Sequence, residues 1–159
     1  MVCMGNICRS PMAAAVLSNR TADWIAPKII VDSSGTSPWH IGQKAHATSQ
    51  KVWEAAGYQY SHIARQFQSN GFFTTDLILV MDSSNFNNVI NLAIDDDSRN
   101  KVFYLRSFDA SLASINPMSA QFSELEVPDP YNQSLEAYEE TLFMIERAVD
   151  GLLQVLSRQ

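Results

Sequence analysis

A cysteine and an arginine six positions apart stand near the start of the sequence, in the segment CMGNICRSP at residues 3–11. A loop of this length can curl so that its backbone N–H groups point inward, and a following helix adds the positive end of its dipole. The planar Arg9 guanidinium matches two oxygens of a tetrahedral oxyanion. The same positive field favours the thiolate form of Cys3. The segment therefore predicts an anion-binding loop that carries a nucleophile.

The residues between and after this pair suit such a loop. Gly5 and Asn6 tolerate the left-handed backbone that a tight cradle needs, and Ser10 is placed to donate its hydroxyl to the thiolate. A cysteine and an arginine at this spacing are a weak signal by themselves, because the chain has two cysteines and seven arginines. The pattern gains weight from its place between a strand and a helix that begins with Pro11.

The elements that would position the loop alternate between strand and helix. Short apolar runs predict strands that end at residue 2 and cover residues 28–33, 77–81 and 101–105. Helical patterns cover residues 10–24, 48–56, 84–92 and 135–156, with Gly57 and Ser134 as caps, and residues 106–133 are expected to be irregular.

This alternation predicts an α/β fold with three layers, in which a short central parallel sheet of about four strands has helices on both faces. The anion-binding loop follows the first strand, and ligands of such sheets bind at the carboxyl ends of the strands. Cys3 is placed there.

Composition limits the classes of protein that fit. A length of 159 residues with 46% apolar side chains predicts one domain over residues 1–159. Eleven Lys and Arg against 17 Asp and Glu argue against a nucleic-acid-binding chain. The longest apolar run, residues 12–17, is too short to span a membrane, and no signal peptide fits before Cys3, so we expect a cytoplasmic protein. Two cysteines and three histidines form no zinc pattern, and we expect neither metal nor cofactor.

The segment VCMGNICRSP resembles the phosphate-binding loop of the low-molecular-weight protein tyrosine phosphatases. Further stretches similar to that family follow in the same order at residues 31–42 (VDSSGTSPWHIG), 61–66 (SHIARQ), 76–85 (DLILVMDSSN) and 127–131 (VPDPY). Separated blocks in one order are a specific signal, and the resemblance covers nearly the whole chain. It implies hydrolysis of phosphotyrosine through a cysteinyl-phosphate intermediate.

The resemblance also implies roles for matched residues. Cys3 would be the nucleophile, Arg9 the phosphate clamp and Asp129 the general acid, since a tyrosine that leaves as its anion needs a proton. Pro128 and Pro130 would fix the bend that presents Asp129. The non-bridging phosphate oxygens would be bound by the backbone amides of the loop, which belong to Met4, Gly5, Asn6, Ile7, Cys8 and Arg9.

A supporting network and the walls of the cleft follow from the same resemblance. Behind the loop, Ser10 and a hydrogen-bonded network would support it, comprising Asn6, Ser33, His62 and Ser84, with Asp82 and Asn85 nearby. Trp39, His40 and Tyr131 would form walls that sandwich a phenyl ring. Asn132 stands where many family members have an aromatic residue, so one wall is expected to be more polar.

Other readings stay open at this point. An arsenate reductase of the same fold would need relay cysteines, and residues 9–159 contain none. A non-catalytic phosphopeptide-binding module would be favoured if Arg9 or Asp129 were missing, and both are present. Only two residues precede Cys3, so either the central strand is short or the recorded chain starts late.

The expected partners are a phosphotyrosyl protein, with a bacterial-type tyrosine kinase as one family-level option, and inorganic phosphate or a similar oxyanion in the loop. Cys3 and Cys8 lie in one curled loop. We therefore expect a redox pair, in which Cys8 condenses with oxidised Cys3 and prevents further oxidation.

Overall fold

Four parallel strands form the centre of the molecule. The computed structural model describes residues 1–116 and 118–158. The strands are β1 (Val2–Cys3), β2 (Ser34–Gly35), β3 (Ile78–Val80) and β4 (Val102–Tyr104), in the order β2-β1-β3-β4. The first strand is therefore central, with Val2 opposite both Ser34 and Val80. The predicted α/β fold with a short parallel sheet is confirmed.

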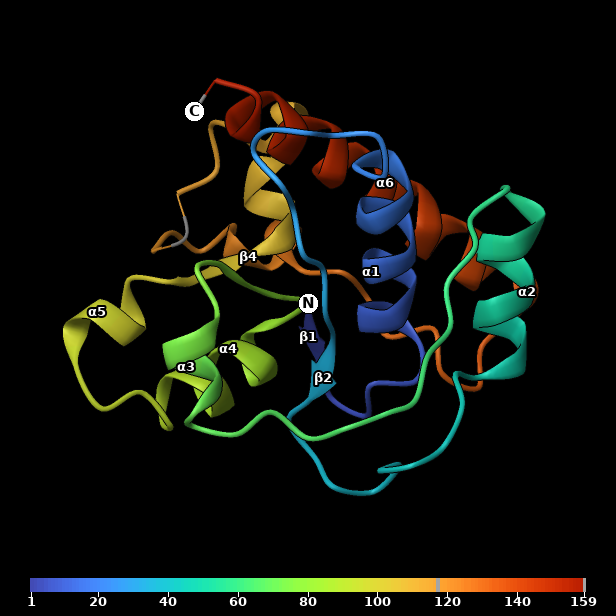
Figure 1. The fold of residues 1–159 in the computed structure, drawn as a ribbon, viewed down its shortest axis with the longest axis horizontal. Coiled ribbons are helices and arrows are strands. Elements are labelled where there is room, and N and C mark those ends of the chain that lie inside the picture. The colour runs from blue at the N-terminus through green and yellow to red at the C-terminus, as the bar shows by residue number, and fades with distance from the viewer. Residues whose placement is uncertain (117, 159) are drawn as a thin grey trace.

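Helices cover both faces of the sheet (Figure 1). The α-helices are α1 (Arg9–Arg20), α2 (Ala47–Ala55), α3 (Gly71–Thr74), α4 (Ser83–Ile90), α5 (Asp96–Arg99) and α6 (Leu135–Leu156). Between β4 and α6 the chain forms the short 3₁₀ turns η1 (Leu105–Phe108), η2 (Ala110–Leu112) and η3 (Phe122–Leu125), so residues 106–133 are largely irregular as predicted.

Alternate side chains of the strands divide the core into two clusters. Cys3, Leu79 and Met81 point to the face covered by α1, α2 and α6. Val2, Ile78 and Val80 point to the opposite face, where they join Phe72 of α3 and Val89 of α4. This alternation is the period of two that a strand imposes on its side chains. The sheet is therefore buried on both sides, as the three-layer prediction required.

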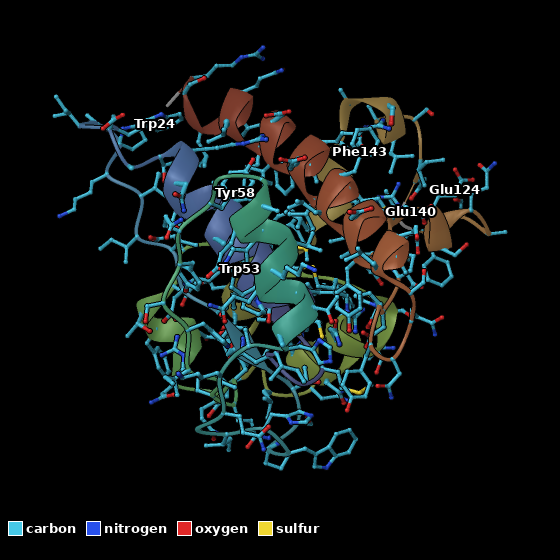
Figure 2. The ribbon with its side chains drawn as sticks, turned by 90° about the vertical axis from the view of Figure 1, so that its right-hand side faces the viewer. Trp24, Trp53, Tyr58, Glu124, Glu140 and Phe143 are labelled. Atoms are coloured by element: carbon cyan, nitrogen blue, oxygen red, sulfur yellow. The ribbon has the colours of Figure 1, made fainter. Side chains whose placement is uncertain are left out.

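The helix after the first loop packs very closely against its neighbours. Residues 12–16 of α1 are fully buried, and three of them are alanines, whose small side chains let neighbouring elements approach. Trp53 of α2 fills the adjacent core with no exposed surface, whereas Phe143 and Glu140 lie on the outer side of α6 (Figure 2). The N-terminus of α1 is consequently fixed against the sheet.

The prediction of a strand at residues 28–33 is wrong. The strand that pairs with β1 is Ser34–Gly35. Because Val2 lies opposite Ser34, residues 28–33 run past the start of β1 and have little backbone to pair with. Their contacts to it are the Ser34 N–H to the Met1 carbonyl at 3.0 Å and the Met1 amino group to the Asp32 carbonyl at 2.8 Å.

Helix boundaries were predicted less well than helix positions. The first helix ends at Arg20 and not at residue 24, and the hydroxyl of Thr21 donates to the Leu17 carbonyl at 2.8 Å at its end. The C-cap of the second helix is Ala56, and Gly57, with φ +91°, lies just past it. Ser134 is the N-cap residue of α6. The short helices α3 and α5 were not predicted, because four residues are too few for a helical period. None of the helices in residues 1–116 and 118–158 combines the length and hydrophobicity that a membrane span requires.

Candidate active site

The loop between β1 and α1 forms a cradle at the carboxyl edge of the sheet. Cys3 ends β1, and α1 begins at Arg9 with Pro11 in its first turn. Cys8 takes the N-cap position but makes no side-chain cap, so the first amides of the helix remain available to an anion. The Asn6 N–H already points at the Cys3 sulfur, at 3.3 Å. The loop thus directs the backbone N–H of Asn6 toward the Cys3 sulfur.

Asn6 holds the left-handed turn of the cradle. Its φ is +56°, and its side chain is fully buried. One Nδ2 proton is donated to Ser10 Oγ at 2.8 Å and the other to Ser33 Oγ at 3.0 Å, while Oδ1 accepts from the Arg65 N–H at 2.9 Å. All side-chain hydrogen-bonding groups of Asn6 are therefore used, which stabilises a backbone conformation that most residues avoid.

His62 completes a ring of hydrogen bonds with Asn6 and Ser33. The His62 Nε2 lies 2.6 Å from the Asn6 carbonyl, to which only an N–H can donate, and Nδ1 lies 3.5 Å from Ser33 Oγ. The proton on Nε2 leaves Nδ1 as the acceptor for the serine hydroxyl. Burial lowers the pKa of His62, and its bond to the Asn6 carbonyl only partly offsets this. The neutral imidazole is thus the form that supports the loop.

Glycine at position 35 lets the loop approach β2. A Cβ there would lie 2.6 Å from the Met4 carbonyl oxygen and 3.0 Å from the Asn6 nitrogen. On the other side, the N–H groups of Thr36 and Ser37 donate to the carbonyls of Cys3 and Met4, at 2.9 Å and 3.0 Å. The residues after β2 therefore hold the loop by its carbonyls and leave its amides facing inward.

Ser10 is the immediate neighbour of the candidate nucleophile. Its Oγ lies 3.0 Å from the Cys3 sulfur and 3.3 Å from the Ser34 carbonyl. Since Asn6 already donates to this oxygen, its single proton goes either to the sulfur or to the carbonyl. A Cys3 thiolate cannot donate, so in that state Ser10 donates to the sulfur.

Arg9 connects the loop to the residues after β3 and to the segment that carries Asp129. Its guanidinium is 2% exposed and donates to Asp82 Oδ2 at 2.5 Å, the Val127 carbonyl at 3.0 Å and Asp129 Oδ2 at 2.8 Å. Burial alone would lower its pKa, but the negative charges of Cys3, Asp129 and Asp82 raise the pKa instead. Arg9 therefore carries a fixed positive charge between the candidate nucleophile and acid.

Asp129 lies in a turn at the mouth of the cradle. Its side chain is 43% exposed, and its Oδ1 accepts from the Tyr131 N–H at 3.2 Å. Asn132 follows with φ +60°, a left-handed conformation that asparagine adopts more readily than an aromatic residue. The departure at Asn132 thus fits the local backbone of the turn, which we call the acid turn (residues 128–132).

The predicted aromatic walls lie on exposed segments. Trp39 is 69% exposed and Tyr131 is 45% exposed. His40 lies directly over Gly5, because a Cβ on Gly5 would come within 2.9 Å of His40 Cδ2. His40 Nδ1 is 2.8 Å from Gln43 Oε1, an acceptor, so Nδ1 carries a proton. His40 and Tyr131 therefore belong to the loops that border the cradle.

Ser84 does not belong to the supporting network. It is exposed and has no recorded hydrogen bond to the network among the described residues. Asp82 caps α4 by accepting from the Asn85 N–H at 2.8 Å, which turns the side chain of Ser84 to solvent and that of Asn85 into the core. Asn6, Ser10, Ser33 and His62 form the network, and Asp82 contributes through Arg9.

Sequence reasoning missed the residues that hold the outer side of the loop. The His46 N–H donates to the Ile7 carbonyl at 2.8 Å, and Ser49 Oγ donates to the Cys8 carbonyl at 2.9 Å. Both lie at the start of α2, where an N-cap pattern gives no hint of a contact with residues 7 and 8. Tyr138 lies within the helix predicted at residues 135–156, and nothing in that pattern links it to the loop.

The second cysteine of the loop is a buried free thiol. Burial, together with the negative charge of Cys3, raises the pKa of Cys8 to about 12. At neutral pH the Cys8 side chain is therefore protonated.

No group of three or more His, Cys, Asp or Glu side chains suited to a metal ion occurs in residues 1–116 and 118–158.

The lowered pKa of His62 predicts how the stability of the protein depends on pH. The unfolded chain binds a proton at the ordinary histidine pKa of about 6.5, whereas the folded chain binds it only at lower pH. The free energy of unfolding should therefore fall as the pH drops from about 7.5 to about 5.5. In His62→Asn, thermal denaturation should show a smaller loss of stability over this pH range than in the wild type. A Ser61→Asn control should keep the wild-type slope, and an unchanged slope in His62→Asn would contradict the assignment.

Comparisons with known proteins agree with this geometry. The model of the family "Low molecular weight phosphotyrosine protein phosphatase" matches residues 1–159. A low molecular weight protein-tyrosine-phosphatase of Streptomyces coelicolor is 38% identical over 159 residues, covering 99% of this chain and 92% of the relative. A protein tyrosine phosphatase of Entamoeba histolytica, solved with Hepes in its active site, superposes with a TM-score of 0.85 at 32% identity, covering 99% and 94% of the two chains. Vibrio vulnificus Wzb in complex with benzylphosphonate gives 0.78 at 28% identity, covering 98% and 95%.

Proposed function

Because the chain belongs to the low molecular weight phosphotyrosine protein phosphatase family, we propose that it hydrolyses phosphotyrosine in proteins with Cys3 as the nucleophile. The observation that carries this assignment is the bridge that Arg9 makes between the loop of Cys3 and the carboxylate of Asp129. This bridge supports a site in which a nucleophile, an anion clamp and an acid act around one point at the edge of the sheet.

In the first step, the Cys3 sulfur attacks phosphorus in line with the phenolic oxygen. The S–P bond forms as the P–O bond breaks, and Asp129 gives its proton to the departing phenolate. The backbone amides of residues 4–9 and the Arg9 guanidinium bind the non-bridging oxygens and neutralise their developing charge. The phosphoryl group of the substrate competes with Asp129 for the Arg9 guanidinium. Substrate binding therefore frees the Asp129 carboxyl group to face the leaving group.

In the second step, water attacks phosphorus while Asp129 accepts one of its protons. The S–P bond breaks, inorganic phosphate leaves, and the Cys3 thiolate is regenerated. Ser10 is 3.0 Å from the sulfur, and its proton turns from the Ser34 carbonyl to the sulfur as negative charge returns there. The loop thus supplies a donor for the thiolate at the moment when it leaves.

Substrate choice follows from the borders of the cradle. Trp39, His40 and Tyr131 are the candidate walls for the phenyl ring of phosphotyrosine, and a shorter phosphoserine side chain would not reach the base of such a slot. The substrate is a phosphotyrosyl protein, of which a bacterial-type tyrosine kinase is one candidate. Inorganic phosphate, the product, also fits the loop. Since Cys3 must stay reduced, we place the reaction in the cytoplasm.

The alternative functions have less support. Reduction of arsenate would require cysteines that relay a disulfide, and no cysteine follows Cys8 in the sequence. A module that only binds phosphopeptides would need neither an acid at the mouth nor a hydroxyl beside the sulfur, and the site has both.

Turnover of p-nitrophenyl phosphate tests the nucleophile and the metal-free mechanism together. The wild type should hydrolyse this substrate in the presence of EDTA, and Cys3→Ser should lose the activity because a serine hydroxyl is a far weaker nucleophile here. A Ser61→Ala control on the exposed surface should match the wild type. Activity that requires a divalent metal ion, or that survives in Cys3→Ser, would refute the proposal.

The role of Asp129 is tested by the leaving group. Asp129→Asn should slow the hydrolysis of aryl phosphates with basic phenols by about 100-fold or more, whereas esters of acidic phenols should be slowed much less, since those depart without a proton. The measurement is kcat over a series of phenyl phosphates. An equal loss across the series would remove Asp129 from the acid role.

Redox protection is the role we propose for Cys8. Peroxide oxidises Cys3 to a sulfenic acid, which condenses with the Cys8 thiol to form a disulfide and water. Oxidation removes the thiolate charge beside Cys8, one of the two main causes of its raised pKa. After brief peroxide treatment, dithiothreitol should restore most activity in the wild type but little in Cys8→Ser. Equal recovery would show that Cys8 protects nothing and only packs the loop.

A further inference from the structure

The start of α2 is tied to the carbonyl side of the phosphate-binding loop. The His46 N–H donates to the Ile7 carbonyl at 2.8 Å, and the Ser49 hydroxyl donates to the Cys8 carbonyl at 2.9 Å. Ser49 is fully buried. The backbone of His46 is therefore fixed relative to the loop, whatever its side chain does.

The His46 ring makes a second set of contacts, on the side of α6. Its Nδ1 accepts from the Thr48 N–H at 3.3 Å, which caps α2, and lies 3.2 Å from Tyr138 Oη. Tyr138 is 1% exposed, and burial raises the pKa of its hydroxyl, so the hydroxyl keeps its proton. Because Nδ1 accepts, the proton of the neutral ring is on Nε2. The ring stacks on Tyr138 with centroids 5.4 Å apart.

The same ring contacts the acid turn. His46 and Tyr131 lie edge to face, with ring centroids 5.7 Å apart and an interplanar angle of 76°. Tyr131 in turn donates its N–H to Asp129 Oδ1. His46 thus joins the loop that carries Cys3 to the turn that carries Asp129, with α6 as its support.

Besides the contact with His46, the acid turn is restrained by the ion pair of Asp129 with Arg9 and by the backbone hydrogen bond of Asn132 to the Tyr138 hydroxyl. A cavity of about 230 Å³ separates it from α6, lined among others by Pro128, Pro130, Gln133 and Ala137. The ion pair between Arg9 and Asp129 holds the turn on the inner side, and a phosphoryl group bound to Arg9 would weaken that pair. The contact between His46 and Tyr131 involves neither Arg9 nor Asp129, so a phosphoryl group does not compete for it directly.

We propose that His46 is a positioning residue, whose ring holds the acid turn over the phosphate-binding loop while the phosphoryl group of the substrate is bound to Arg9. The inference rests on the proposed phosphatase function. Loss of the ring should therefore impair proton transfer from Asp129 and the aromatic wall at Tyr131. It should not impair the binding of an anion that needs only the loop.

Two substitutions separate the ring from the helix cap. His46→Asn removes the ring and keeps an acceptor suited to the N-cap position of α2, where asparagine is among the preferred residues. His46→Phe keeps a ring and removes the acceptor. Lys51→Ala, on the exposed side of α2, is the control for a substitution in this helix.

The experiment measures kcat and KM for aryl phosphates with basic and acidic phenols, together with the inhibition constant of inorganic phosphate. An aromatic pair contributes about 0.5–1.5 kcal/mol, which corresponds to roughly 2- to 12-fold. In His46→Asn, kcat for the phosphate ester of a basic phenol should fall by about that factor relative to kcat for the ester of an acidic phenol. The inhibition constant of phosphate should stay within about twofold of the wild-type value. His46→Phe should keep the wild-type ratio and lose thermal stability through its missing cap.

Several results would overturn the proposal. One is a His46→Asn variant whose ratio of kcat between the two aryl phosphates equals that of the wild type. Another is an equal loss of kcat on both substrates together with weaker inhibition by phosphate, which would mean that the side chain only stabilises the loop. If His46→Phe does not fold, the comparison between substrates in His46→Asn still decides. Failure of the phosphatase assignment itself would look different, since the wild type would then hydrolyse neither substrate.

Discussion

A buried positive charge organises this site. The Arg9 guanidinium lies in the protein with 2% of its surface exposed, where an unpaired charge would be strongly unfavourable. Its anionic partners come from the end of β3 and from the acid turn, while its own backbone belongs to the loop after β1. Three segments far apart in the sequence therefore meet at one edge of the sheet. An oxyanion at this point adds negative charge to a site already built to neutralise it.

The topology makes this meeting possible. Because β1 is the second of the four strands, its loop has β2 on one side and β3 on the other. The β2 side supplies Ser33, Gly35 and the carbonyl of Ser34, which fix Asn6 and Ser10. The β3 side supplies Asp82, whose two carboxylate oxygens cap α4 and bind Arg9. The short strands are sufficient because α1, α2 and α6 bury one face of the sheet and α3 and α4 the other.

The sequence predicted local features better than distant ones. Cys3, Gly5, Asn6, Arg9 and Pro11 are neighbours, so their spacing alone predicted a strand, an anion-binding loop and a helix. The places of Ser33, His62 and Asp129 followed only from the resemblance to a family, since no local pattern links them to the loop. Ser84 was wrongly predicted to join the network, because the cap at Asp82 turns the side chain of Asn85, and not that of Ser84, into the core. His46 was not found, because its role depends on contacts with Ile7, Tyr131 and Tyr138 that only the folded chain creates.

The most direct test of the account is to locate the phosphoryl group during turnover. The wild-type protein is mixed with p-nitrophenyl phosphate and quenched, and tryptic peptides are sequenced by mass spectrometry. Cleavage after Arg9 separates both cysteines from Ser10, and fragmentation then distinguishes Cys3 from Cys8. The account predicts one phosphoryl group on Cys3 in the wild type, and more of it in a variant with Asp129→Ala when the leaving group is acidic, because hydrolysis of the intermediate is slowed. A phosphoryl group on Cys8 or Ser10, or full activity with none on Cys3 at any quench time, would contradict it.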